Sequence, residues 1–188
     1  MRPYPVSAAT LFLVVVSSAV ADTPLQDENL LVALPTGWVL GNGARQGDLT
    51  MMEYVPAGQT VEDWKQMITV QILHGRGHVK PLAFLKEMTR AAKEQVVANG
   101  FSELSMDAPA DPEYPTAGTI WLSEHVKSTG KGEITLIRVI QGKDALYVVQ
   151  KAWRQSPFKT AEQMEVTTEE MREGIEFLWK ARVVDTRK

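Results

Sequence analysis

Residues 119–153 read TIWLSEHVKSTGKGEITLIRVIQGKDALYVVQKAW, and this stretch decides the fold. It contains three apolar segments, 119–127, 133–141 and 145–153, which are separated by short turns rich in glycine and lysine. Turns of this length between strand-like segments predict three consecutive antiparallel strands. In the middle segment, apolar side chains occupy both odd and even positions, so we expect both faces of the sheet to be covered there.

Shorter extended segments are predicted on the N-terminal side of these strands. Residues 30–34, 48–55 and 101–106 have patterns typical of strands, and residues 38–40 are extended. The glycine-rich run 41–47 has a spacing one residue too long for a dinucleotide-binding loop, and it is followed by a strand rather than a helix. We therefore interpret this run as a hairpin turn.

A first helix is predicted from residue 60 and ends at Gly75. Residues 60–63 resemble a capping box, and apolar residues then follow at helical spacing. The end of this segment is also compatible with a strand, because Ile68, Val70 and Ile72 alternate with polar residues.

Two further helices complete the prediction. One begins at Pro81, a favourable first helical residue, and stops at the dipeptide 99–100. The other follows the capping box formed by Thr167 and Glu170. The sequence therefore predicts an α+β domain, in which a mostly antiparallel sheet of about seven strands carries three packed helices.

Residues 1–21 have the features of a cleavable export signal. Arg2 precedes the apolar run 8–16, and Ala19-Val20-Ala21 is a small-x-small cleavage site. The apolar run is shorter than the roughly 20 residues of a spanning helix, so we expect no membrane span after cleavage. We expect a disordered polar segment at 22–28, a single domain at 29–188, and a periplasmic or secreted location in a bacterium.

Composition disfavours several functions. The chain of 188 residues has 20 Lys and Arg against 23 Asp and Glu, and loss of Arg2 with the signal leaves 19 − 23 = −4. A weakly acidic protein is a poor candidate for binding nucleic acid or an anionic membrane surface. The absence of cysteine excludes disulfides, thiol catalysis, thiolate zinc sites and iron–sulfur clusters.

Histidine supplies the one candidate metal site. His74 and His78 lie four residues apart in a glycine-containing loop, and His125 or Glu124 is a distant candidate for a third ligand. A metal site requires three or four ligands fixed by supporting hydrogen bonds, and the sequence offers two close together. We predict no bound cofactor.

Aromatic residues suggest a second kind of site. In one register of the three predicted strands, Trp121 and Trp153 share a face with Tyr147. If no helix covers that face, the three side chains form an exposed aromatic patch that would bind a ligand or a protein. If a helix covers it, they belong to the core.

The order of the elements resembles the PsbP-like fold, named after an extrinsic subunit of photosystem II. Residues 34–38, Leu-Pro-Thr-Gly-Trp, resemble the Pro-x-Gly-Trp sequence that opens such domains. Residues 53–64 are also similar to a segment of small secreted bacterial proteins. The resemblance covers about residues 30–184 and implies a non-catalytic, accessory role without transferable catalytic residues.

These observations favour an exported protein that binds an unidentified protein or small molecule without catalysing a reaction. No catalytic residue is predicted. The alternative function is a metal-binding protein or a metal-dependent enzyme that uses His74 and His78.

Overall fold

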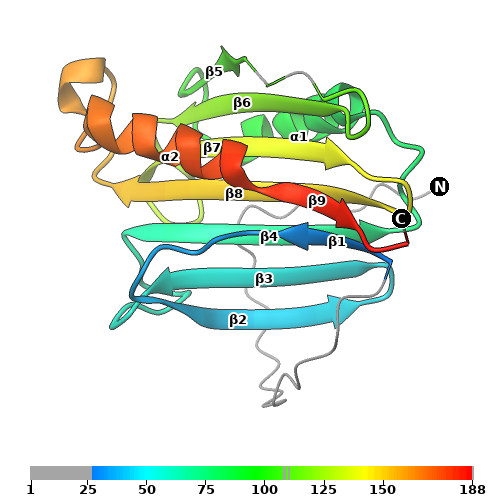
Figure 1. Cartoon of the computed structure of the whole chain (residues 1–188). Helices are drawn as coiled ribbons and strands as arrows, with labels where there is room; N and C mark the ends of the chain where they lie inside the picture. The colour runs from blue at the N-terminus through cyan, green and yellow to red at the C-terminus, as the bar shows by residue number, and fades with distance from the viewer. Residues whose placement is uncertain (1–26, 108, 110, 188) are drawn as a thin grey trace.

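The structure is a computed structural model that describes residues 27–187, apart from 108 and 110 (Figure 1). The expected signal at 1–21 and residues 22–26 of the expected disordered segment lie outside the described residues. The secondary-structure elements are, in order, β1 (Glu28–Leu31), β2 (Trp38–Gln46), β3 (Leu49–Pro56), β4 (Gln66–His74), α1 (Pro81–Gln95), β5 (Phe101–Met106), β6 (Thr116–Ser123), β7 (Gly132–Gln141), β8 (Ala145–Gln155), the 3-10 helix η1 (Ala161–Gln163), α2 (Thr168–Lys180) and β9 (Arg182–Asp185).

Seven strands form one antiparallel sheet in the order β2-β3-β4-β8-β7-β6-β5. The meander predicted from residues 119–153 is confirmed as β6, β7 and β8, which lie side by side between β4 and the end strand β5 (Figure 1). The α+β class and the seven-strand sheet are therefore confirmed. Strands β1 and β9 pair with each other as a separate two-stranded ribbon.

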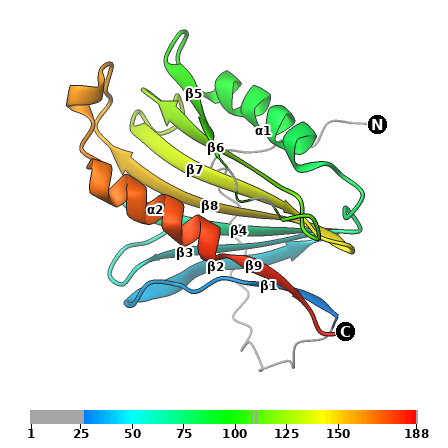
Figure 2. The ribbon, with the colours of Figure 1, turned by 45° about the horizontal axis from the view of Figure 1, so that its top comes forward.

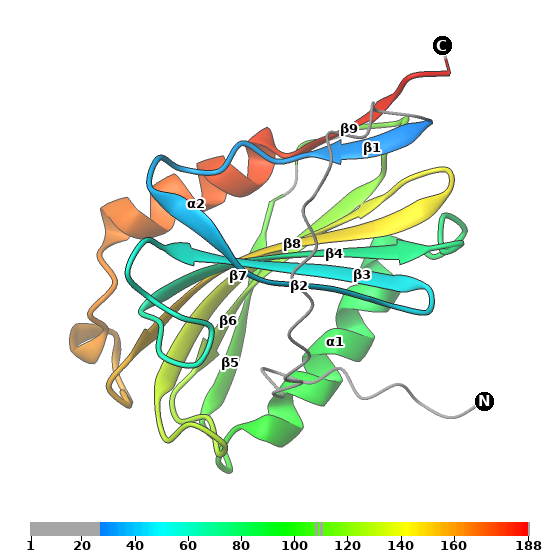
Figure 3. The same cartoon turned by 90° about the horizontal axis from the view of Figure 1, so that it is seen from below.

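The two α-helices cover opposite faces of the sheet (Figures 2 and 3). Helix α1 packs against β6 and β7, whereas α2 packs against β7 and β8, on the same side as the β1–β9 ribbon. Strand β7 therefore lies beneath both helices, and nearly all of its residues are buried. This confirms the expectation that the middle strand of the meander is covered on both faces.

The core under α2 is the larger of the two. Leu178 of α2 contacts a fully buried layer from the sheet, which includes Ile68, Leu136 and Val149. Trp153 fills the space beneath the middle of α2, where Gly174 leaves room for its ring. A Cβ atom at position 174 would lie 2.6 Å from Trp153 Cη2, so the helix reaches this depth only because residue 174 is glycine.

The helix predicted over residues 60–75 is wrong, because residues 66–74 form β4. Alternation of Ile68 and Val70 places these side chains against α2, and pairing with β3 and β8 on both sides satisfies the backbone. The capping hydrogen bond predicted at residues 60–63 is present, since Thr60 Oγ1 accepts a hydrogen bond from Asp63 N at 3.1 Å. However, no α-helix follows it. The described residues thus contain two α-helices, not three.

The run 41–47 is not a hairpin turn as a whole. Residues 41–46 lie inside β2, where the register with β3 shifts between Leu40 and Asn42. The turn itself is confined to residues 47 and 48, and Gly47 adopts φ +57°, a conformation that favours glycine. Gly41 and Gly43 lie inside β2, and glycines within a strand are typical of a β-bulge rather than of a chain reversal.

The first residues of both helices follow the predicted signals. Pro81 is the first residue of α1, and Thr167 Oγ1 accepts the Glu170 N–H at 3.1 Å while the Glu170 side chain accepts the Thr167 N–H at 2.8 Å. Helix α1 ends at Gln95, earlier than the predicted stop at residues 99–100. Within the described part of the chain, neither helix has the length and apolar character to cross a bilayer.

The proposed aromatic patch is not formed. Trp153 and Tyr147 share the α2 face of the sheet, but Trp121 lies on the opposite face, in the core beneath α1. The three side chains are 4%, 2% and 8% exposed, so all belong to the core.

Candidate functional site

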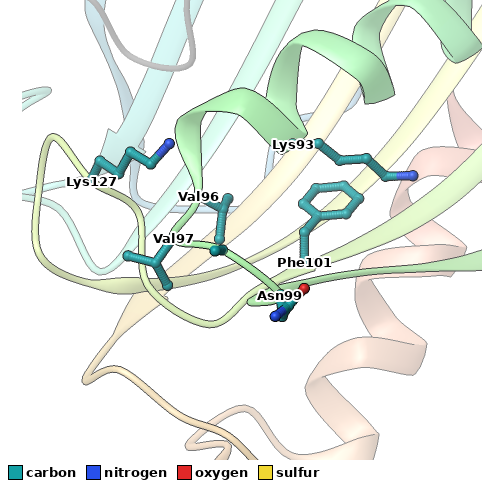
Figure 4. Close-up of a pocket in the computed structure, with 7 residues that line it drawn as sticks. Lys93, Val96, Val97, Asn99, Phe101 and Lys127 are labelled. Atoms are coloured by element: carbon teal, nitrogen blue, oxygen red, sulfur yellow. The ribbon is translucent and has the colours of Figure 1, made fainter.

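A pocket of about 380 Å³ lies where α1 ends and β5 begins (Figure 4). Its residues come from the end of the helix, the following turn, the first residue of β5 and the β6–β7 loop. They are Lys93, Val96, Val97, Ala98, Asn99, Phe101 and Lys127.

The turn after α1 shapes this pocket. Asn99 adopts φ +63°, in the left-handed region that Asn tolerates better than most residues. The following Gly100 leads the chain directly into β5, whose first residue is Phe101. The ammonium of Lys93 lies 5.5 Å from the centre of the Phe101 ring, a cation–π contact at the edge of the pocket.

Lys127 closes the other side of the pocket. Its Nζ donates a hydrogen bond to Glu94 O at 2.7 Å, and its backbone N–H donates to Gln95 O at 2.9 Å. These bonds satisfy two of the carbonyl groups that a helix leaves free at its C-terminus, where positive charge is also favourable. The β6–β7 loop is thereby fixed against the end of α1, which places Lys127 beside the same apolar residues as Lys93.

A second pocket, of about 230 Å³, adjoins the first through Val97. Val97 N donates to His125 O at 3.1 Å, which joins the segment after α1 to the loop after β6. The residues of this second pocket are Val97, Glu124, His125, Pro157, Phe158, Lys159 and Gln163. We call the residues of both pockets together the Val97 surface.

The charge of the Val97 surface is opposite to that of the whole protein. Lys93, Lys127 and Lys159 are exposed, and none of them forms an ion pair with another described residue. Glu124 is the one acidic residue among those that line the two pockets. Because the chain carries a net charge of −3, three lysines without an ion pair among the described residues, placed around apolar side chains, form a local basic site.

A buried lysine on the other side of the sheet is the second chemically unusual feature. Lys151 of β8 is 8% exposed, and its ammonium lies 5.1 Å, 5.9 Å and 6.0 Å from the ring centres of Trp153, Trp38 and Phe177. Among the described residues, Lys151 has cation–π contacts but no ion pair. Burial lowers the pKa of Lys151, and the nearby carboxylates of α2 partly oppose that effect.

The sequence motif at residues 34–38 supplies one wall of this lysine environment. Gly37 adopts φ +81°, and Trp38 N donates to Pro35 O at 3.3 Å, so the chain reverses before β2 begins. The reversal places the Trp38 ring against Lys151. Residues 35–38 therefore form a turn, and the turn positions the Trp38 ring beside the buried ammonium of Lys151.

The three candidate metal ligands lie in different settings. His74 ends β4 with its Nε2 3.0 Å from Thr50 Oγ1, His78 is exposed in the loop before α1, and His125 lines the second pocket. In residues 27–187 without 108 and 110, no group of three His, Cys, Asp or Glu side chains is arranged to hold a metal ion. The third ligand required beside the His74–His78 loop is therefore not found in this part of the chain, and the metal hypothesis stays a prediction.

The sequence matches no protein-family model. It also matches none of the curated proteins with which it was compared. The candidate site thus depends on the geometry of this chain alone.

The sequence reasoning missed the residues of the first pocket, whereas Glu124 and His125 of the second were named only as candidate metal ligands. Lys93, Phe101 and Lys127 come from a helix, a strand and a loop, so no short motif contains them. One signal was available: Asn99-Gly100 marked the chain reversal that brings these three segments together.

Proposed function

We propose that this protein is a non-catalytic, exported accessory protein that binds a partner protein through the Val97 surface. The partner segment carries carboxylate groups beside apolar side chains. The observation that carries this proposal is the placement of Lys93 and Lys127 on either side of an apolar floor formed by Val96, Val97 and Phe101 (Figure 4).

The chemistry of the surface favours such a segment. Unpaired ammonium groups attract carboxylates and steer association, whereas burial of apolar side chains supplies affinity. The two pockets lie near or below the lower end of the range for small-molecule sites, about 300–1,000 Å³. Two adjoining pockets of this size suit side chains that project from a partner protein better than one enclosed ligand.

The resemblance of the chain to PsbP-like domains supports an accessory role. That resemblance rests on the element order and on residues 34–38. We include membership of the PsbP-like group in the proposal. Fold likeness says nothing about the binding site, so the proposal for the partner depends on the Val97 surface.

Selection from a display library of random dodecapeptides tests this proposal. We expect the exported, processed protein to enrich peptides in which Asp or Glu lies close to aliphatic or aromatic residues. The variant with Lys93→Glu and Lys127→Glu should bind the selected peptides at least about tenfold more weakly, a loss of about 1.4 kcal/mol.

The matched control carries Lys86→Glu and Lys180→Glu, which change the net charge equally at exposed positions outside the Val97 surface. Equal weakening by the control would show a general charge effect and contradict the site. Selection of peptides without acidic residues would contradict the proposed chemistry. Turnover of a substrate that is lost on a point substitution in a pocket would contradict the non-catalytic role.

A further inference from the structure

Strand β5 ends the seven-strand sheet, so one of its edges has no strand partner among the residues that the structure describes. Ser102, Glu103, Leu104 and Ser105 are exposed, and Leu104 is 48% exposed, which is high for a leucine in a strand. The strand lies at the rim of the molecule in Figure 1, next to α1 in Figure 2. Its outward N–H and C=O groups are therefore available for another strand.

The opposite edge of the sheet is protected in a way that β5 is not. Strand β2 has a register shift between Leu40 and Asn42, contains Gly41 and Gly43, and carries Arg45 near its end. Such irregularities and charges discourage pairing with a further strand. Strand β5 pairs with β6 in six consecutive register positions and contains no glycine, proline, lysine or arginine.

The open edge of β5 is continuous with the Val97 surface. Phe101 is the first residue of β5 and also lines the first pocket, beside Lys93. The first pocket therefore adjoins the beginning of this open edge.

We propose that the partner segment binds as an added β-strand along the open edge of β5. This inference rests on the proposed function and specifies how the partner is held. Backbone hydrogen bonds to β5 supply affinity, and side chains at fixed positions supply selectivity, as in other cases of strand addition.

The register gives the segment a sequence signature. Phe101 and Leu104 are three residues apart, so their side chains lie on opposite faces of β5. A strand paired with β5 has the same spacing and alternation. It therefore carries an Asp or Glu next to Lys93 and Phe101, and an apolar residue three positions away that covers Leu104.

N-methylated peptides test the strand geometry without altering the protein. Two versions of a selected dodecapeptide are methylated on the backbone nitrogens of odd or of even positions. In an added strand only alternate N–H groups face the protein, so one version should bind at least about tenfold more weakly and the other should bind normally. Equal binding of both versions overturns strand addition, even if the Lys93 and Lys127 substitutions still abolish binding.

Leu104→Ser provides a second test, and Leu82→Ser is its matched control. Leu82 of α1 is 58% exposed, so both substitutions remove a similar exposed side chain. We expect only Leu104→Ser to weaken peptide binding and to remove the preference for an apolar residue three positions from the acid. Equal binding by the two variants overturns the inference, as does a concentration-dependent dimer through β5 that the peptide does not dissociate.

Discussion

Arg138 Nη1 donates a hydrogen bond to the carbonyl oxygen of Ala181 at 2.6 Å, and this bond joins the centre of the sheet to the end of α2. The same nitrogen also donates to Leu178 O at 2.9 Å, and Arg138 Nε donates to Thr116 Oγ1 at 3.1 Å. Arg138 is 6% exposed, and its guanidinium lies 5.0 Å from the centre of the Trp179 ring. A buried cation of β7 therefore caps the C-terminus of α2.

Replacement of Arg138 by methionine should destabilise the protein by about 2–4 kcal/mol, because carbonyl groups of α2 then remain buried without donors. Urea unfolding followed by tryptophan fluorescence measures this loss. Arg138→Lys should recover part of it, since an ammonium also donates to helix carbonyls. Arg90→Met, at an exposed position, is the control, and similar stabilities for both methionine variants would contradict the capping role.

Lys151→Met should leave the protein at least as stable at pH 7. The substitution removes a buried charge without an ion-pair partner and keeps an unbranched side chain of similar length. A loss of more than about 2 kcal/mol would instead show that the three aromatic rings make the charge stabilising. Lys65→Met at an exposed position is the control.

The pH dependence of stability provides an independent test of the lowered pKa of Lys151. Burial lowers the pKa of Lys151 in the folded state, so between that pKa and the unfolded value of about 10.4 the unfolded chain binds more protons. The free energy of unfolding therefore rises with pH through this interval. Lys151→Met should remove that rise in urea titrations at successive pH values, and an unchanged slope would exclude the shift.

Tyr147 has the opposite effect on the pH dependence of the free energy of unfolding. Burial, together with the hydrogen bond from Tyr147 Oη to Glu28 Oε1 at 2.9 Å, raises the pKa of its phenol. Above about pH 10 the unfolded chain loses this proton while the folded protein keeps it, so the free energy of unfolding falls as pH rises. Tyr147→Phe should cost about 1 kcal/mol at neutral pH and flatten the alkaline fall. A parallel fall in the variant would assign it to other groups.

Gly174→Ala should destabilise the protein by about 1–3 kcal/mol, even though alanine favours helices by about 1 kcal/mol. The added methyl group meets the Trp153 ring, and α2 then has to move away from the sheet. Thermal unfolding measures the change. Glu173→Ala, one residue away and exposed, should change stability little, and a stable Gly174→Ala variant would show that Trp153 can move.

The fold could be predicted from the sequence where interactions between residues close in the chain determine the structure. The β6–β7–β8 meander and the cap at Thr167 could be predicted because short turns and a capping box act over a few residues. Residues 66–74 were misread because the hydrogen bond between Thr60 and Asp63 imitates a helix start, whereas β4 owes its form to neighbouring strands distant in sequence.

The candidate site was less predictable than the fold. Lys93 and Lys127 are 34 residues apart in the sequence, and both line the first pocket because the β6–β7 loop binds the last carbonyl groups of α1. The spacing of residues in the sequence does not predict this contact between Lys127 and the end of α1. The open edge of β5 was likewise invisible, because the run FSELSM indicates a strand but not its position within the sheet.

The ribbon formed by β1 and β9 affects how the chain reaches its native state. Asn29 pairs with Val184, so the ribbon closes a loop that includes almost the whole described chain. A chain that emerges N-terminus first keeps Leu30 without Val183, its neighbour in the core, until the last residues are free. We therefore expect docking of the ribbon to be a late folding step, slowed by the entropy of closing so long a loop.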